Sequence, residues 1–184
     1  MYGVFARSAD DVWAVGTAGA SSLILHWNGA SWARLGGPKY GQYGVKIFGV
    51  AAVSPRLTWL AGVAKNGLPL IVRWNGSTLR KLPRPKPKLG GVLTGISAVS
   101  ARQAWAVGAS DLHGESTRTW IFRWQGHAWL RVPSPARRVA GNLRGLFALS
   151  AKDVWAVGYT GLGIGTGSRG FILHWNGATW RAAA

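Results

Sequence analysis

The sequence predicts an all-β protein made of four similar units, and three observations lead to this prediction. A step of the type Trp-Ala-Val-Gly occurs four times, at Trp13, Trp59, Trp105 and Trp155. Each step is followed by a Trp-Asn-Gly or Trp-Gln-Gly hairpin signal. The steps lie 46, 46 and 50 residues apart. Four-stranded units at this period are typical of β-propeller blades, so we predict a β-propeller of four four-stranded blades.

The first strand of each blade is predicted from a Gly-led apolar stretch that ends in Ser, at residues 3–8, 49–54, 95–100 and 145–150. Every copy carries an alanine near its middle: Ala6, Ala52, Ala98 and Ala148. A side chain this small suits the innermost position, where the blades crowd around the axis.

The other three strands follow in order from short stretches rich in β-branched and aromatic residues. The second strand contains the Trp-Ala-Val-Gly step, and the third ends at the hairpin tryptophan. The fourth begins five residues later, at Trp32, Leu79, Trp129 or Trp180. Asn-Gly between the third and fourth strands favours positive φ at both positions, which predicts a two-residue hairpin turn.

The predicted domain spans residues 1–184, with blades at about 1–38, 47–83, 92–133 and 143–184. The second-strand and hairpin tryptophans are separated by 14, 15, 19 and 20 residues, so this connection varies in length. In a propeller it emerges on the same face as the connection between successive blades. We expect any ligand-binding residues on that face.

The number of blades in the working assembly stays open at this point. The four blades could form a closed ring, an arc that associates with another copy, or part of a larger propeller. An unpartnered blade would expose an apolar side face, which favours self-association.

Two motifs carry a resemblance to a known family. Asp11–Gly16 and Asp153–Gly158 both read Asp-Val-Trp-Ala-Val-Gly, and Leu25–Gly29 and Leu173–Gly177 both read Leu-His-Trp-Asn-Gly. With these motifs the chain resembles a bacterial β-propeller repeat of exported proteins with unassigned function, similar to Kelch/galactose-oxidase-like and Asp-box propellers. The resemblance implies the fold over practically the whole chain and an extracellular or cell-envelope location. It implies no activity, because propellers serve many functions. No signal peptide is visible at Met1.

The chain has 12 tryptophans, and eleven of them fall in three repeat columns. Residues that recur at one position of every unit are expected to pack blade against blade. The alternative is an aromatic platform that stacks on sugars or bases. The eleven are Trp13, Trp27, Trp32, Trp59, Trp74, Trp105, Trp124, Trp129, Trp155, Trp175 and Trp180.

The net charge of +17 comes from 22 Lys and Arg against 5 Asp and Glu. This balance favours an anionic polymer, such as nucleic acid or an acidic glycan, or an acidic protein as partner. The alternative is a solvated basic linker. The cations predicted to bind on the loop-bearing face are Lys39, Lys65, Arg84, Lys86, Lys88, Arg118, Arg137, Arg138 and Arg169.

Catalytic and metal chemistry find little support in the sequence. The absence of cysteine excludes disulfides, thiolate metal sites and a copper site that needs a Cys-linked Tyr. His113 lies between Asp111 and Glu115, a weak candidate for a divalent metal or a hydrolase site. Residues 165–170 read Gly-x-Gly-x-x-Gly but lead into a strand, whereas a dinucleotide site needs a helix there. We therefore predict no cofactor and no metal, and no apolar run is long enough to span a membrane.

These observations favour a non-enzymatic β-propeller binding module whose basic loop face engages an anionic polymer or an acidic protein. A lectin-like propeller that holds a glycan in the axial channel or between blades is one alternative. A structural fragment of a larger secreted propeller is another.

Overall fold

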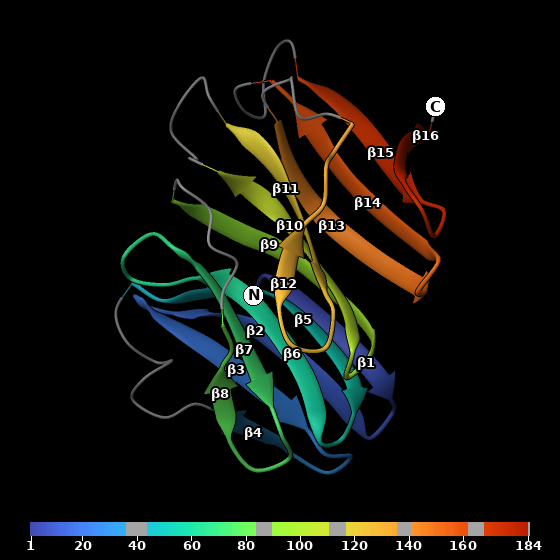
Figure 1. The fold of residues 1–184 in the computed structure, drawn as a ribbon. Helices are drawn as coiled ribbons and strands as arrows, with labels where there is room; N and C mark the ends of the chain where they lie inside the picture. Colours follow the sequence, from blue (N-terminus) through green and yellow to red (C-terminus); the bar gives the residue numbers. More distant parts are fainter. Residues whose placement is uncertain (36–43, 84–89, 111–116, 136–140, 162–167, 184) are drawn as a thin grey trace.

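A computed structural model describes residues 1–35, 44–83, 90–110, 117–135, 141–161 and 168–183. The described residues form four antiparallel sheets of four strands each, and in every sheet the strands neighbour one another in chain order (Figure 1). This confirms the prediction of an all-β protein with four four-stranded units. No helix occurs in these ranges, and so none that could cross a membrane.

Each sheet is one blade. The first contains β1 (Gly3–Ser8), β2 (Asp11–Ala18), β3 (Ser21–Trp27) and β4 (Trp32–Leu35). The second contains β5 (Lys46–Ser54), β6 (Leu57–Val63), β7 (Pro69–Trp74) and β8 (Leu79–Lys81). The third contains β9 (Gly91–Ser100), β10 (Gln103–Ser110), β11 (Arg118–Trp124) and β12 (Trp129–Arg131). The fourth contains β13 (Gly141–Ser150), β14 (Asp153–Thr160), β15 (Arg169–Trp175) and β16 (Trp180–Ala183).

The first strands of the second, third and fourth blades begin three or four residues before the predicted start. A register shift next to the glycine that opens each predicted stretch lets the strand continue, as between Ile47 and Gly49. The shift also presses a carbonyl of the first strand onto the glycine of the Trp-Ala-Val-Gly step. A Cβ on Gly108 would lie 1.9 Å from the carbonyl oxygen of Val92. This glycine is therefore required by close backbone approach.

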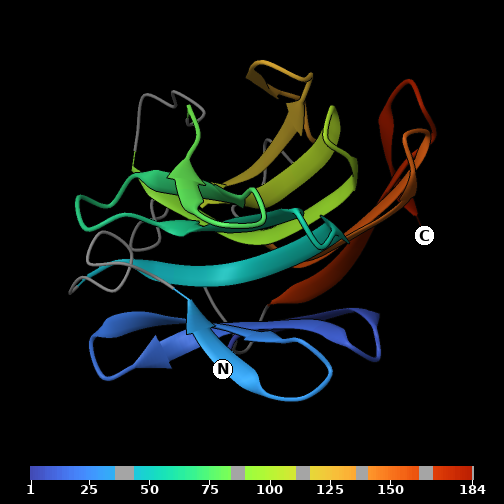
Figure 2. The same ribbon diagram turned by 90° about the horizontal axis from the view of Figure 1, so that it is seen from below.

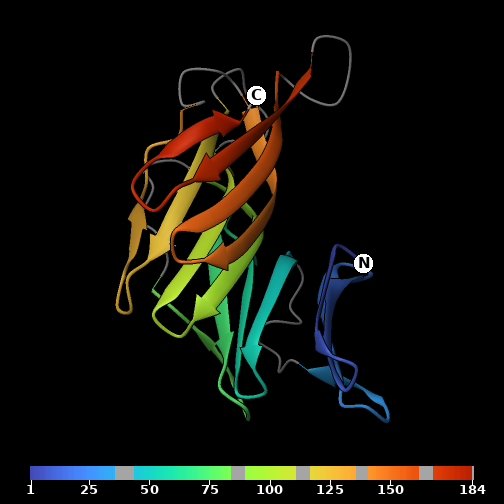
Figure 3. The ribbon, with the colours of Figure 1, turned by 90° about the vertical axis from the view of Figure 1, so that its right-hand side faces the viewer.

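The blades follow one another as an arc, with β1–β4 at one end and β13–β16 at the other (Figures 2 and 3). The first strand of each blade lies on the inside, and β5 packs against β1 and β9 while β13 packs against β9. The tightest approach between inner strands occurs at glycine: a Cβ on Gly3 would lie 2.7 Å from the carbonyl oxygen of Phe48, and one on Gly49 would lie 3.0 Å from the backbone nitrogen of Ile96. We expected the alanine column to have this role. Of this column only Ala52 is buried, and the glycines that open the first three stretches, Gly3, Gly49 and Gly95, approach the next inner strand instead.

The buried apolar residues of the described ranges form three clusters, and each lies between two successive blades. Trp13 belongs to the cluster between the first and second blades, Trp59 to the next, and Trp105 to the cluster between the third and fourth. Because each cluster needs side chains from two sheets, a blade is stabilised by its neighbours.

The hairpins between the third and fourth strands differ from the two-residue turn that the sequence predicts. Trp27 pairs directly with Trp32, which leaves a four-residue loop closed by a hydrogen bond from the Asn28 N–H to the Ser31 carbonyl (3.3 Å). Asn28 Oδ1 accepts hydrogen bonds from the N–H groups of Ala30 and Ser31. The asparagine thus stabilises the loop through its side chain, and Gly29 supplies the positive φ of 92°.

The loop-bearing end of the sheets is joined by three equivalent hydrogen bonds. Gly44 precedes the second blade, and Gly91 and Gly141 begin the third and fourth. Their N–H groups donate to the carbonyls of Ala20, Gly67 and Thr117, respectively, in the turns of the preceding blade. The two classes of connection that we expected on one face therefore meet there, as far as the structure describes them.

Candidate functional site

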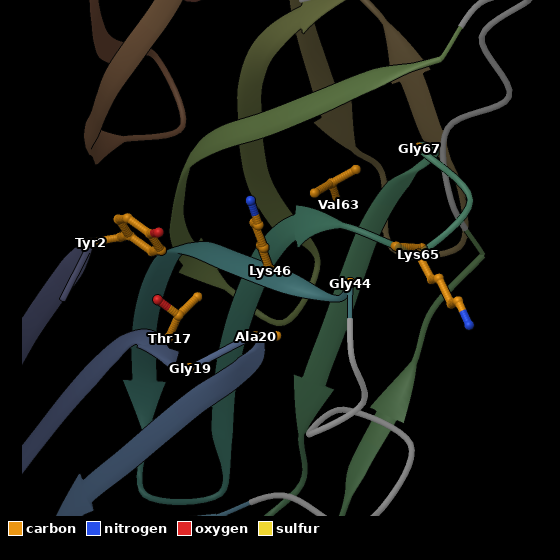
Figure 4. A pocket seen from close by; sticks show the side chains of 10 residues that line it. Tyr2, Thr17, Gly19, Ala20, Gly44, Lys46, Val63, Lys65 and Gly67 are labelled. Atoms are coloured by element: carbon orange, nitrogen blue, oxygen red, sulfur yellow. The ribbon is translucent and has the colours of Figure 1, made fainter.

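A pocket of about 500 Å³ lies between the first two blades, at the loop-bearing end of the sheets (Figure 4). Tyr2 and Thr17 line it from the first blade, and Lys46, Val63 and Lys65 line it from the second. The other lining residues are small ones of the adjoining turns: Gly19, Ala20, Gly44, Ala64 and Gly67. The volume falls within the range of small-molecule sites, ~300–1,000 Å³.

Tyr2 forms an aromatic wall of this pocket. Its N–H donates a hydrogen bond to the Val15 carbonyl (2.8 Å), which continues the pairing of β1 with β2. Its ring packs against that of Phe48 on β5, with centroids 5.0 Å apart and planes inclined by 49°. The ring is thus held by both blades, although 52% of the residue stays exposed. An apolar ring face and a hydroxyl group are both available to a ligand.

Lys46 supplies the positive charge. It is the first residue of β5, and its ammonium group points into the space between Tyr2 and Val63 (Figure 4). Lys65 follows β6, and its ammonium group points away from the other labelled side chains, so its aliphatic stem lines the rim. The hydroxyl of Thr17 faces the pocket from β2.

Glycines with positive φ shape the rim. Gly19, Gly44 and Gly67 have φ values of 59°, 85° and 73°. A Cβ on Gly19 or Gly67 would meet nothing within 4 Å, so the backbone conformation, and not lack of space, requires glycine there. The turns therefore hold the rim in shape without filling it.

The lining favours a hydroxyl-rich ligand with negative charge. No Asp or Glu contributes among the described lining residues. The Lys46 ammonium and the hydroxyls of Tyr2 and Thr17 are hydrogen-bond donors. An anionic group bound beside Lys46 would form a charge-assisted hydrogen bond.

Of the nine cations predicted to bind an anion, the structure describes three. Lys65 lies at the pocket rim, while Arg118 and Arg169 begin β11 and β15 at the same end of the third and fourth sheets. The other six lie outside the described residues: Lys39, Arg84, Lys86, Lys88, Arg137 and Arg138. Only Lys65 of the three is brought to the pocket.

The repeat tryptophans differ in burial. Seven are buried: Trp13, Trp59, Trp105, Trp124, Trp129, Trp175 and Trp180. Trp27 and Trp74 are partly buried. Trp32 and Trp155 are exposed. The buried ones lie in the clusters between blades, and the exposed ones belong to the two blades at the ends of the arc.

A hydrogen-bonded set surrounds the buried Asp11. Trp13 Nε1 donates to Asp11 Oδ1 (2.9 Å), His26 Nε2 lies 2.9 Å from the same oxygen, and Arg7 Nε donates to Oδ2 (2.5 Å). Burial acts to raise the pKa of the Asp11 carboxyl, but the hydrogen bonds from Arg7, His26 and Trp13 lower it. The net pKa lies below the ordinary value.

The fourth blade repeats this set in an open setting. His174 Nε2 lies 2.9 Å from Asp153 Oδ1, and the His174 ring stacks on Trp155 with centroids 4.2 Å apart. Asp153 is 43% exposed at its side chain, whereas Asp11 is 5% exposed. In the second and third blades an arginine takes the place of the histidine: Arg73 lies over Trp59 and Arg123 over Trp105. This column therefore packs on tryptophan.

No group of three or more His, Cys, Asp or Glu residues that could hold a metal occurs within the described ranges. The candidate around His113 lies outside the described residues, as does the first half of the Gly-x-Gly-x-x-Gly stretch at 165–170.

The comparisons with known proteins identify the fold. No family model and no curated protein matches the chain. The structure of the fucose-specific lectin from Aleuria aurantia matches with a TM-score of 0.61 and 14% identity, over 95% of this chain and 55% of that chain. A variant of that lectin in complex with Fucα1-6GlcNAc matches with a TM-score of 0.56 and 12% identity, over 95% of this chain and 56% of that chain. YCF48 with a bound peptide matches with a TM-score of 0.48 and 14% identity, over 95% of this chain and 65% of that chain.

The fold is a β-propeller. The chain spans little more than half the length of the lectin chains that it matches. At 12–14% identity the similarity shows the fold and carries no residue of the lectin site to this chain. It does not extend to a Kelch-type assignment.

Of the residues that line the pocket of this propeller, only Lys65 was among the predicted site residues, and the polar side chains of Tyr2, Thr17 and Lys46 were missed. A signal for Lys46 was available, because the register aligns it with Val92 and Asn142, both of which are buried. A charged residue in a column of buried ones indicates a local opening. Tyr2 and Thr17 carry no such signal, because only the packing of two blades brings them together.

Proposed function

We propose that this chain is a non-enzymatic, glycan-binding β-propeller module that takes an acidic saccharide in the pocket between its first two blades. The observation that supports this most is the combination of an exposed aromatic ring, two hydroxyls and an ammonium group around a pocket of about 500 Å³ without a carboxylate among its described lining residues. In the similar lectin, the same fold binds a fucosylated saccharide.

Each group has a specific part in this proposal. The ring of Tyr2 stacks on the apolar face of a sugar, and Thr17 hydrogen-bonds to a sugar hydroxyl. Lys46 pairs with the carboxylate or sulfate of the sugar. The positive net charge attracts acidic saccharides to the surface and speeds their encounter.

The test is calorimetric titration of the full chain with a sulfated disaccharide derived from heparin and with its unsulfated counterpart. We expect the sulfated form to bind more tightly. Lys46→Gln should weaken its binding about tenfold or more, because a hydrogen bond between charged groups contributes roughly 1.5–3 kcal/mol.

Lys152→Gln is the matched control. Lys152 is exposed in the turn between β13 and β14, at the opposite end of the sheets from the pocket, and its loss changes the net charge by the same amount. Equal weakening in both variants would reduce the proposal to a general charge effect. A Lys46→Gln variant that binds as the parent does would contradict it.

A second candidate rests on the net charge of +17 and on the placement of Lys65, Arg118 and Arg169 at one end of the blades. An anionic polymer lying across that end would contact several cations. Its binding would fall more than about tenfold between low and physiological salt. Lys46→Gln would then change the binding of long heparin far less than salt does.

A further inference from the structure

The fourth blade exposes a face that is buried in each of the other three blades. Trp155 is 38% exposed, whereas the equivalent Trp13, Trp59 and Trp105 are 0%, 0% and 1% exposed. Val157 and Ile172 share this face with Trp155, because they alternate with it or pair beside it in the sheet. Both are more than 40% exposed, while Val15, Val107, Ile24, Ile71 and Ile121 at the equivalent positions are buried. We call Trp155, Val157 and Ile172 the open fourth-blade face.

The first blade presents the other half of the same kind of contact. Its hairpin tryptophans, Trp27 and Trp32, have ring centroids 5.8 Å apart and planes inclined by 47°. Trp32 is 49% exposed, whereas its equivalents Trp129 and Trp180 are 8% and 6% exposed. Val4, on the same blade, is 72% exposed. We call Val4, Trp27 and Trp32 the open first-blade face.

The internal contacts between blades show how the equivalent faces pack. Trp59 of the second blade packs against the hairpin pair of the third, with centroids 5.6 Å from Trp124 and 5.9 Å from Trp129. Trp105 of the third blade packs in the same way, 5.0 Å from Trp175 and 5.4 Å from Trp180. In each case the second-strand tryptophan of one blade meets the hairpin pair of the next.

The Trp27–Trp32 pair of the first blade already has the geometry of the hairpin pairs that pack against a tryptophan. The Trp124–Trp129 pair has a centroid distance of 5.5 Å and an angle of 48°, and the Trp175–Trp180 pair has 6.0 Å and 49°. The centroid distance of the Trp27–Trp32 pair, 5.8 Å, lies between these two distances, and its angle of 47° is close to theirs. The exposed pair therefore needs no rearrangement to accept a tryptophan, which lowers the cost of association.

The open fourth-blade face also has an internal equivalent with the same residue types. Asp11, Trp13 and His26 of the first blade correspond to Asp153, Trp155 and His174 of the fourth. The first set is covered by the second blade, and Trp13 packs 5.9 Å from Trp74. The fourth-blade set is thus compatible with burial against another blade.

We propose that the open fourth-blade face binds the open first-blade face of a second copy of this chain, with Trp155 seated against the Trp27–Trp32 pair. The contact is head-to-tail, because it joins two different faces. It repeats the internal contact between blades and continues the arc from one copy into the next.

The test is the mass of the full chain in solution, measured by size-exclusion chromatography with light scattering over a range of concentrations. We expect species of at least twice the monomer mass of 19.6 kDa. Trp155→Glu and Trp32→Glu should each reduce the assembly to monomer, because a carboxylate in an apolar contact is strongly unfavourable. Leu130→Glu changes an exposed leucine of the third blade that belongs to neither face, and it should leave the assembly intact.

Mixing the two variants separates a head-to-tail contact from a symmetric one. Trp155→Glu keeps its first-blade face and Trp32→Glu keeps its fourth-blade face, so an equimolar mixture should form a dimer through the one intact pair of faces. A mixture that stays monomeric contradicts the proposal, as does a Trp32→Glu chain that still self-associates. A parent chain that is monomeric at all concentrations also overturns it and leaves the faces to a different blade. Circular dichroism checks folding, and Val157→Glu serves as a second fourth-blade variant if Trp155→Glu unfolds.

Discussion

Asp11 and Asp153 occupy the same position in the first and fourth blades, and the structure predicts different consequences when each loses its charge. Asp11 is buried and accepts hydrogen bonds from Arg7 and Trp13, with His26 at 2.9 Å. Asp153 is 43% exposed at its side chain, and His174 Nε2 lies 2.9 Å from its Oδ1. Asparagine at either position keeps the shape of the side chain and removes its charge.

The expected cost at Asp11 follows from these contacts. Asp11→Asn keeps one oxygen for Trp13 and replaces the other by an amide that cannot accept from Arg7. The loss of one charge-assisted hydrogen bond in a buried site is worth about 2 kcal/mol in the free energy of unfolding. Asp153→Asn alters an exposed pair and should cost no more than about 0.5 kcal/mol.

The cost at Asp11 should depend on pH with a definite sign. Because its folded pKa is lowered, the Asp11 carboxylate contributes stability that is fully present above its unfolded pKa of about 3.9. That contribution is lost as the pH falls through the lower folded pKa. The difference between the parent and Asp11→Asn should therefore be constant near neutral pH and shrink below about pH 4.

The assay is urea unfolding followed by tryptophan fluorescence, at pH 7 and at steps down to pH 3. Asp153→Asn is the matched control, since it makes the same change at the same repeat position. The reasoning is refuted if the two variants lose equal stability at pH 7, or if the Asp11→Asn deficit persists unchanged at pH 3.

Two further stability predictions use matched pairs of blades. Trp105→Ala should lower the free energy of unfolding by about 3–5 kcal/mol because it leaves a cavity in the cluster between the third and fourth blades. Trp155→Ala should cost roughly 1 kcal/mol when measured at low protein concentration, where its face is exposed. Gly108→Ala should cost about 3 kcal/mol or more, since the new Cβ would lie 1.9 Å from a carbonyl oxygen. Gly16→Ala should cost less, because its new Cβ would lie 2.8 Å from the Met1 Cα, a less severe approach than at Gly108; similar melting temperatures for the two glycine variants would contradict this.

The strands and their order were predictable from the sequence because their signals are local. The spacing of Trp13 from Trp27 and the Ser that ends each first strand are readable without knowing any neighbour. The start of β9 was not, because its extension depends on a register shift next to Gly108 in the paired strand. The turn after Trp27 was misjudged for a similar reason: its length depends on the Trp27–Trp32 pair across the hairpin.

The candidate site was predictable only in part. Lys65 was identified from its charge and its place in a variable connection. Tyr2, Thr17 and Lys46 belong to different segments of two blades, and no local pattern links them. A pocket between blades depends on how two sheets pack. Lys46 lines it at a position where the repeat equivalents, Val92 and Asn142, are buried.

The limit of the local signal is clearest in the hexapeptide Asp-Val-Trp-Ala-Val-Gly, which occurs unchanged at residues 11–16 and 153–158. By itself the sequence determined that both copies form a second strand with the tryptophan on one sheet face, because alternation and turn chemistry act within a few residues. Only the tertiary structure decided that Trp13 is fully buried and Trp155 is 38% exposed. The physical reason is that burial depends on the blade that covers the face, and the blade that covers Trp13 begins only at Lys46, far outside the range of local sequence signals.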